Sequence, residues 1–332
     1  MSVIFTPFLF QSAMQAITPI LLASLAGVLC GRVGVFNLAL EGQMLVGAFA
    51  AIVGSYFTHS AVGGVAAAMA GAVAFSLVLA YGATVFRGDP VVIGIGMNLL
   101  ASGLTAYLLR GTFGVSGAFS DPGIVGLGRI AIPPLIGVPV LGWAFGRQSA
   151  LTWVAWALTA LVSVVLFKTP VGLRLRGVGE EPDAAETLGV DIARYRVVTV
   201  LVAGALTGLA GAQLSLGAVS VFAEDMSAGR GWIAVVAVML GRNNPLYVAA
   251  ACVLFGFADA LSINLQSQGL PNQLTDISPY LATLAALVIS HRRRTRAPRP
   301  PAEVAAAGAC PAPVSTGGST LDADRGSRFR AD

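Results

Sequence analysis

The stretch GRVGVFNLALEGQMLVGAFAA, residues 31–51, lies inside an apolar run that extends from residue 12 to residue 57. A segment that only crossed a bilayer as a helix would have no use for Arg32, Asn37 and Glu41. A charged side chain at the centre of a membrane helix costs about 2.5–3.5 kcal/mol on insertion scales, and such groups usually face a protein interior or a cavity. The stretch therefore predicts a membrane helix that breaks and then restarts.

Composition extends this prediction to the whole chain. Of its 332 residues, 56% are hydrophobic and 11% are charged, against about 25% charged in soluble domains, and the mean hydropathy is +0.79. Apolar runs of about twenty residues recur, and each is long enough to cross a bilayer as a helix. We expect an all-α, polytopic transmembrane helical bundle of about 8–10 spans with broken or half-helices. The expected spans are residues 12–30, 38–57, 62–86, 90–109, 150–168, 196–219, 231–244 (short enough for a half-helix), 245–265 and 276–290.

Several chemistries have no support in this sequence. The start, MSVIFTPFLFQ, lacks a basic region and a small-residue cleavage site, so we expect no removable signal peptide. Cys30 and Cys252 fall in apolar spans and Cys310 lies near the C-terminus, with no CxxC pair or metal-ligand spacing. The two histidines, His59 and His291, fall in expected loops. We therefore expect no metal site, no catalytic residues and no nucleic-acid partner.

Arginine and lysine near the ends of spans indicate the orientation in the membrane. The densest clusters lie in residues 168–196 and 291–332, so we expect both on the cytoplasmic side. Counting spans then places the Gly/Pro-rich loop 110–149 outside. Residues 1–290 form the expected transmembrane domain. The tail, residues 291–332, is too polar to bury a core and is expected to be disordered, although its arginine cluster could also touch anionic lipid.

Two Gly-interrupted segments, residues 31–41 and 222–245, break the apolar pattern in the two halves of the chain. Such paired interruptions often mark the site of a membrane transporter. Asn37 and Glu41 are four residues apart and share one face if the second helix restarts near Phe36. Two interpretations stay open, and they are compatible. Asn37 can cap the restarted helix while Glu41 neutralises its positive end, or either side chain can contact a substrate.

Asn98 and Asp259 are the other notable polar residues within expected spans. An asparagine in a membrane helix more often binds a neighbouring helix than a ligand. Asp259 approaches the outer end of its span, so a gate or a helix–helix contact is as compatible with its position as a substrate site.

The charged segment 168–196 predicts a short helix at about residues 182–188. Pro182 suits the first turn, acidic residues suit its positive end, and Gly189 can end it. The acidic face disfavours anionic lipid, so we expect this helix to dock on a partner protein. The residues expected at its surface and ends are Glu180, Pro182, Ala184, Ala185, Leu188 and Gly189.

Five ordered motifs carry a resemblance to a known family: GVFNLALEGQMLVGAFAA, VGLRLRGVGEEPDAAETLGVDIARYR, GRGWIAVVAVMLGRNNPL, LFGFADAL and SPYLATLAALV. Together they span about residues 12–290. The chain resembles permease subunits of bacterial ATP-binding-cassette importers, in the branch that serves branched-chain amino acids, simple sugars and nucleosides. The Asn-Leu-x-Leu-Glu-Gly form looks most like the nucleoside-type permeases.

The resemblance implies a multi-pass protein of the bacterial cytoplasmic membrane that imports nucleosides by alternating access. The chain has no GxxxxGK[ST] motif followed by a nucleotide-binding fold. ATP and Mg²⁺ would therefore be bound by a partner ATPase, which docks on the 182–188 helix, and this chain would hold no cofactor. The other implied partners are a second permease subunit, most simply a related chain, an extracytoplasmic substrate-binding protein, and membrane lipid.

A nucleoside presents neutral hydrogen-bonding groups and an apolar base, so its path calls for polar side chains between apolar walls. The residues expected to supply the polar part are Asn37, Glu41 and Asn98, and those expected to supply the walls are Phe36, Met44 and Met97. Three alternatives are a permease for a simple sugar such as ribose, an ion-coupled transporter with protons on Glu41 and Asp259, and an intramembrane enzyme. The last lacks any catalytic constellation.

Overall fold

The computed structural model describes residues 7–131 and 147–266. Within these residues, seven helices are long and apolar enough to cross a membrane. The long helices are α1 (Pro7–Arg32), α2 (Leu40–Thr58), α3 (Ala61–Thr84), α4 (Pro90–Phe113), α7 (Ala150–Lys168), α10 (Ile192–Ala212), which continues as the π-helical segment η1 (Gln213–Val219), and α12 (Pro245–Gln266). The expected all-α bundle with multiple spans is confirmed.

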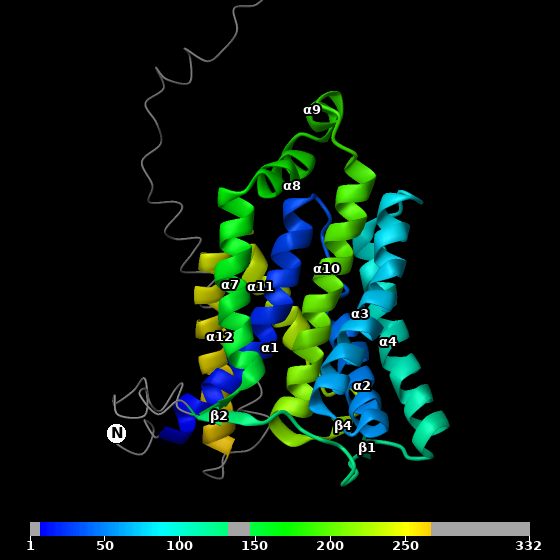
Figure 1. Cartoon of the computed structure of the whole chain (residues 1–332), viewed down its shortest axis with the longest axis vertical. Helices are drawn as coiled ribbons and strands as arrows, with labels where there is room; N and C mark the ends of the chain where they lie inside the picture. Colours follow the sequence, from blue (N-terminus) through cyan, green and yellow to red (C-terminus); the bar gives the residue numbers. More distant parts are fainter. Residues whose placement is uncertain (1–6, 132–146, 267–332) are drawn as a thin grey trace, which may run out of the picture. The chain divides into compact units, whose positions relative to one another are not determined.

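Three shorter helices and four short strands complete the described fold. The helices are α8 (Pro170–Glu180), α9 (Pro182–Thr187) and α11 (Arg230–Leu240), and the strands are β1 (Ala118–Phe119), β2 (Arg129–Ala131), β3 (Arg147–Ser149) and β4 (Phe222–Ala223). The strands form two antiparallel pairs, β1 with β4 and β2 with β3. Figure 1 shows α8 and α9 at one end of the helices and β1, β2 and β4 at the other. We call these the α8 end and the β1 end.

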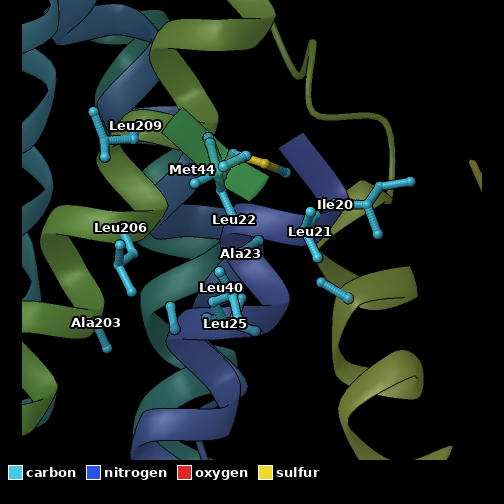
Figure 2. Close-up of a cluster of buried hydrophobic side chains, with 14 of the residues drawn as sticks. Ile20, Leu21, Leu22, Ala23, Leu25, Leu40, Met44, Ala203, Leu206 and Leu209 are labelled. Carbon is cyan, nitrogen blue, oxygen red and sulfur yellow. The ribbon is translucent and has the colours of Figure 1, made fainter. Parts of the chain in front are cut away.

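The core forms around α1, because almost all of its membrane-length stretch is buried among other helices. It packs against α10, α11 and α12. Figure 2 shows its leucines meeting side chains of α2 and α10. The labelled core residues are Ile20, Leu21, Leu22, Ala23, Leu25, Leu40, Met44, Ala203, Leu206 and Leu209. A helix that is apolar all round is suited to this central position.

Glycine permits a close contact among α2, α3 and α10. A Cβ on Gly47 of α2 would lie 2.9 Å from the Cα of Gly208 of α10, and a Cβ on Gly208 would lie 2.5 Å from the carbonyl oxygen of Ala68 in α3. Small residues allow backbones to approach in this way in membrane helices. The three helices therefore lock together without large side chains between them.

Eight of the nine expected spans have a described helix in the same place. The span expected at 196–219 begins earlier, at Ile192. The segment expected as a half-helix is α11, which has 11 residues. A helix that was not expected, α8, precedes α9. It begins at Pro170, because Thr169 accepts a hydrogen bond from the Gly172 N–H (3.2 Å) and proline suits the first turn. The expected span 276–290 and the tail 291–332 lie outside the described residues.

Candidate functional site

The helix break predicted at residues 31–41 is present. The helix α1 ends at Arg32, residues 33–39 are not helical, and α2 begins at Leu40. Gly34 turns the chain with φ +78°, a conformation that glycine adopts without strain. The break leaves backbone carbonyls that need donors, since lipid offers none.

Arginines supply hydrogen-bond donors to backbone carbonyls at the α8 end, one of them in the break. Arg196 of α10 donates from Nε to the carbonyl of Val33 (3.2 Å), and Arg32 donates from Nε to the carbonyl of Asn243 (2.8 Å), beyond the end of α11. Gly31 lets these segments meet, because a Cβ there would lie 2.5 Å from the Asn243 side chain. Arg32 is therefore part of the junction that closes this end of the bundle.

Asn37 orders the chain just before α2 restarts. Its side chain is buried, and its Oδ1 accepts a hydrogen bond from the Ala39 N–H (2.9 Å). Its Nδ2 donates to Oε1 of Gln43 (3.2 Å), which also accepts from the hydroxyl of Thr207 in α10 (3.3 Å). The N-cap residue of α2 is Ala39. Asn37 is therefore not the helix cap, and its hydrogen bond orders the chain two residues before the cap position.

Asn98 of α4 satisfies the first turn of α2 from outside. Its Oδ1 accepts from the Gly42 N–H (2.8 Å), and its Nδ2 donates to the carbonyl of Leu38 (2.9 Å). The first N–H groups of a helix have no partner within the helix. Asn98 therefore joins α4 to the restart of α2, the contact between helices that is typical of asparagine in membranes.

Glu41 receives the N-terminus of α11. Its Oε1 accepts from the Gly229 N–H (2.8 Å) and its Oε2 accepts from the Gly231 N–H (2.6 Å). A carboxylate at this position compensates the partial positive charge at the start of α11. Gly231 has no room for a side chain, because a Cβ would lie 2.5 Å from Cα of Glu41 and 2.6 Å from its Oε2. The two interrupted segments of the sequence are thus in direct contact.

A second carboxylate lies near the same helix start. Nη2 of Arg230 and Oδ2 of Asp259 in α12 are 3.3 Å apart, and both side chains are largely buried. Of the roles that the sequence left open for Asp259, the structure shows a contact between helices, here α11 and α12. Residues at the start of α11 therefore contact carboxylates from α2 and α12, and Arg230 pairs with the second of them.

The start of α11 lies inside the bundle. Eleven helical residues rise about 16 Å, roughly half of a hydrocarbon core of about 30 Å. The C-terminal side of α11 reaches the α8 end, where Asn243 meets Arg32. The opposite end of α11 begins beside Glu41, in the first turn of α2. This is a half-helix whose positive end points into the protein, an arrangement common in transporters.

The apolar residues predicted to line a substrate path lie in different surroundings. Met44 is 0% exposed and Met97 is 2% exposed, so both pack inside the bundle, whereas Phe36 is 39% exposed. The structure gathers Asn37, Glu41 and Asn98 around the restart of α2, where each is engaged by hydrogen bonds within the chain. It does not give Met44 and Met97 an open surface.

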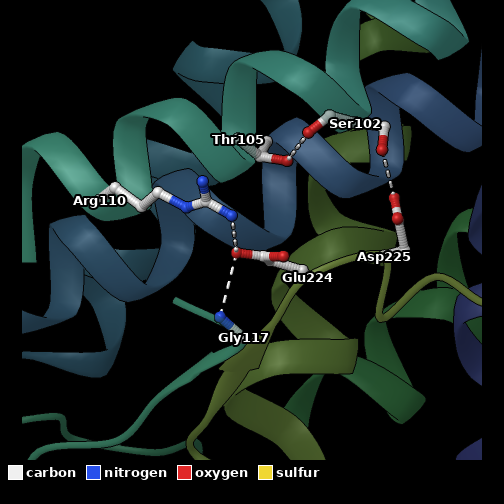
Figure 3. Close-up of polar contacts among 6 residues, drawn as sticks. All are labelled: Ser102, Thr105, Arg110, Gly117, Glu224 and Asp225. Atoms are coloured by element: carbon white, nitrogen blue, oxygen red, sulfur yellow. Dashed lines mark hydrogen bonds and ion pairs between the residues drawn. The ribbon is translucent and has the colours of Figure 1, made fainter. Parts of the chain in front are cut away.

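A polar clamp at the β1 side was not predicted. Figure 3 shows Glu224 between the N–H of Gly117 (3.0 Å) and the guanidinium of Arg110 (4.0 Å), and Asp225 accepting from the hydroxyl of Ser102 (2.8 Å). The clamp ties the segment before α11 to α4 and to the β1–β4 pair. Both acids were visible in the sequence, but their hydrogen-bond partners are 107 and 123 positions away.

The predicted helix at 182–188 is α9, and Gly189 ends it with φ +77°. Its exposed side differs from the expected one. Leu188 is 83% exposed and Ala184 is exposed, whereas Ala185 is 7% exposed. Ala185 therefore packs against the chain itself in this structure, and its role in docking stays a prediction. Glu180, at the end of α8, lies 3.8 Å from Arg32, which links this pair of helices to the helix break.

The fold and these sites define a multi-pass membrane transport subunit with a broken helix and a half-helix. The chain belongs to the family described as "Branched-chain amino acid transport system / permease component", whose model matches residues 9–287. The resemblance seen in the sequence is confirmed.

Curated relatives share most of their length with this chain. It is 35% identical over 280 residues to the guanosine ABC transporter permease protein NupQ of Bacillus subtilis, covering 81% of this chain and 87% of NupQ. It is 34% identical over 288 residues to the nucleoside ABC transporter permease protein NupC of Lactococcus lactis, covering 82% and 88%. A provisionally assigned glucose ABC transporter permease of Haloferax volcanii, TsgC13, is 33% identical, with 85% and 91% covered.

A solved structure supports the fold independently. An inward-facing ABC transporter, assigned to the metal-chelate type, matches with a TM-score of 0.51 and 17% identity, covering 84% of this chain and 85% of that one. The chain is thus a multi-pass permease subunit of an ABC transporter in the cell membrane, and its relatives are transport subunits and not enzymes. Membership of this family implies an ATPase and a substrate-binding protein as partners in general terms.

Proposed function

We propose that this chain is a permease subunit for the import of nucleosides across the bacterial cytoplasmic membrane. The observation that carries the proposal is the similarity, over more than 80% of the chain, to guanosine and nucleoside permeases. Nothing in this proposal requires the permease itself to hold a cofactor. The chain lacks a phosphate-binding GxxxxGK[ST] motif, so ATP and Mg²⁺ belong to the partner ATPase.

The interior chemistry favours a neutral substrate. The exposed start of a half-helix attracts anions, because its N–H groups and its dipole both point at the ligand. Here Glu41 already occupies two of those N–H groups, and Asp259 lies near Arg230. An anionic substrate would have to displace a carboxylate or approach two of them. A nucleoside carries no charge and meets no such repulsion.

We place the substrate path beside the restart of α2, with a revised role for the predicted residues. Asn37, Glu41 and Asn98 hold the backbone of the break in this conformation, so they shape the path and position its walls. Met44 and Met97 are buried here and could meet a substrate only when α2 and α4 move apart during alternating access. Phe36 is the member of the set with an exposed ring in this state.

Energy from ATP enters through α9. The exposed Ala184 and Leu188, in α9 and just after it, form a small apolar surface at the α8 end, in a segment that carries both acidic and basic residues. The adjacent helix α8 is linked to the helix break by Arg32 and Glu180. A movement of α9 imposed by a docked ATPase would therefore reach the junction of α1 and α2 through packed elements.

A second permease subunit completes the path, and we propose that it is a related chain. Three organisms each contribute two similar permeases with the same named substrate: NupQ and NupP, NupC and NupB, and TsgC13 and TsgB13. The face of α4 is the proposed contact. A Cβ added at Gly96 or Gly103 of this helix would meet no atom of the described residues within 4 Å, and small residues favour helix pairing in lipid.

The second candidate is a simple sugar such as ribose or glucose, favoured by the 33% identity to TsgC13. Uptake of labelled guanosine into cells that lack their own nucleoside transporters, and that express the full complex, tests the choice. We expect uptake that excess unlabelled uridine or adenosine abolishes and that excess ribose or glucose leaves unchanged. Sugar uptake without nucleoside uptake would overturn the proposal. Uptake that survives ATP depletion but stops when the proton gradient is dissipated would favour ion coupling instead.

A further inference from the structure

A cleft of about 790 Å³ opens beside the bundle at the α8 end, between α7, α8 and α10. Its deep walls are aliphatic and come from the membrane-spanning helices, with Leu158 and Val162 on α7 and Val202 and Leu206 on α10. This volume lies within the range of about 300–1,000 Å³ that is typical of small-molecule sites. The walls offer no hydrogen-bonding side chain at that depth except Thr199, whose hydroxyl donates to the carbonyl of Tyr195 (2.7 Å).

The mouth of the cleft is charged, and its balance is positive. Arg174 of α8 and Arg194 of α10 are both exposed and both line it. Arg174 donates to the hydroxyl of Tyr195 (3.3 Å), which raises the pKa of Arg174 above its ordinary value. Asp191 is the acid among the lining residues, and its Oδ1 accepts from the backbone N–H of Arg194 (3.0 Å) at the start of α10. Within the described residues, neither arginine forms an ion pair.

We propose that this cleft binds one anionic phospholipid of the cytoplasmic leaflet. One of its two acyl chains would lie between α7 and α10, and its phosphate would lie between the guanidinium groups of Arg174 and Arg194. The apolar lining comes from the membrane-length helices α7 and α10 and the basic lining comes from α8 and the start of α10, which matches the order of groups in a lipid. Arginine matches phosphate geometry with paired donors, and tyrosine is favoured at the membrane interface.

The position of the cleft gives the bound lipid a consequence for transport. Leu188 and Gly189, at the end of α9, also line its mouth, and α9 is the proposed docking helix for the ATPase. A headgroup at Arg174 and Arg194 would join α8 to the start of α10 and so stiffen the base of α9. The permease would then couple better in membranes that contain anionic lipid.

The test is native mass spectrometry of the complete complex, purified in detergent and titrated with phosphatidylglycerol or phosphatidylcholine. The test variant is R174Q/R194Q, and the matched control is R87Q, which removes an exposed arginine outside the cleft lining. Each arginine near a lipid surface contributes roughly fivefold to affinity, so the double variant should bind phosphatidylglycerol about 25-fold more weakly. The wild type and R87Q should bind it equally, and phosphatidylcholine should show no difference among the three.

A second variant, V198W, fills the apolar part of the cleft while keeping both arginines. Val198 is exposed on α10 and lines the cleft. The V198W variant should therefore fold normally, and its larger side chain should exclude the bound phosphatidylglycerol from the cleft. Equal retention of phosphatidylglycerol by the wild type and both cleft variants would overturn the proposal. Loss of the permease dimer in V198W with unchanged lipid retention would also overturn it, because the cleft would then be a protein interface.

Discussion

Replacing Glu41 by glutamine tests whether this side chain holds the half-helix or contacts the substrate. In the structure its two oxygens accept from the N–H groups of Gly229 and Gly231 at 2.8 and 2.6 Å. Glutamine keeps one acceptor and directs an NH₂ group at the other N–H, so one bond is lost and two donors face each other. A hydrogen bond to a charged group is worth about 1.5–3 kcal/mol. We therefore expect the free energy of unfolding to fall by about 2–3 kcal/mol.

The assay is thermal unfolding of the purified complex together with uptake normalised to folded complex. A loss of this size should lower the unfolding midpoint by roughly 3–4 °C in a chain of 332 residues, while normalised uptake stays within about twofold of the wild type, a small effect on the scale of tenfold per 1.4 kcal/mol. Gly231→Ala should be at least as damaging, because its Cβ would lie 2.5 Å from Cα of Glu41. The matched control Gly177→Ala in α8, whose Cβ would meet no atom of the described chain within 4 Å, should be neutral. An unchanged midpoint with uptake reduced about tenfold or more would refute the reasoning and assign Glu41 to the substrate.

Three other predictions follow from the same geometry. Leu188→Asp should abolish transport and substrate-stimulated ATP hydrolysis with normal folding, since its side chain is exposed at the end of α9. Ala185→Asp should instead lower the unfolding midpoint, because Ala185 is buried. Normal coupling in Leu188→Asp would contradict the proposal that the ATPase docks on α9. Single cysteines at Arg174 and Ser120 should react with impermeant reagents only from the cytoplasm and only from outside, respectively, and the reverse pattern would invert the orientation. Deleting residues 297–332 should leave uptake nearly unchanged, and loss of the assembled complex would contradict this.

Sequence reasoning reached most of the helices because hydrophobic length is a local property. The apolar runs predicted the long helices, the short run after residue 230 predicted a half-helix, and Pro182 with Gly189 predicted α9. The helix α8 was missed although its start is also local. Thr169 followed by Pro170 is a usual helix start, but the charged segment after it has no long apolar run to indicate a helix.

The candidate site could be predicted only in part. Sequence alone identified Glu41 and the segment around Gly231 as unusual, because a carboxylate in a membrane span is rare and repeated glycine interrupts it. It could not show that they bind each other, since the hydrogen bonds join residues 188 and 190 positions apart and a single sequence carries no trace of such a pairing. For the same reason the sequence could not decide the role of Asp259, which the structure shows in a 3.3 Å pair with Arg230.

The dependence of α11 on Glu41 also constrains how the protein is made. As the ribosome delivers the chain, α2 enters the membrane long before α11 is synthesised. A segment of 11 helical residues is too short to be retained by the bilayer on hydrophobicity alone, and its first N–H groups have no partner in lipid. Their acceptor, Glu41, must therefore be in place in the membrane before α11 is inserted. Fragments that begin after α10 should therefore be degraded when expressed alone, and co-expression with the N-terminal fragment should rescue them.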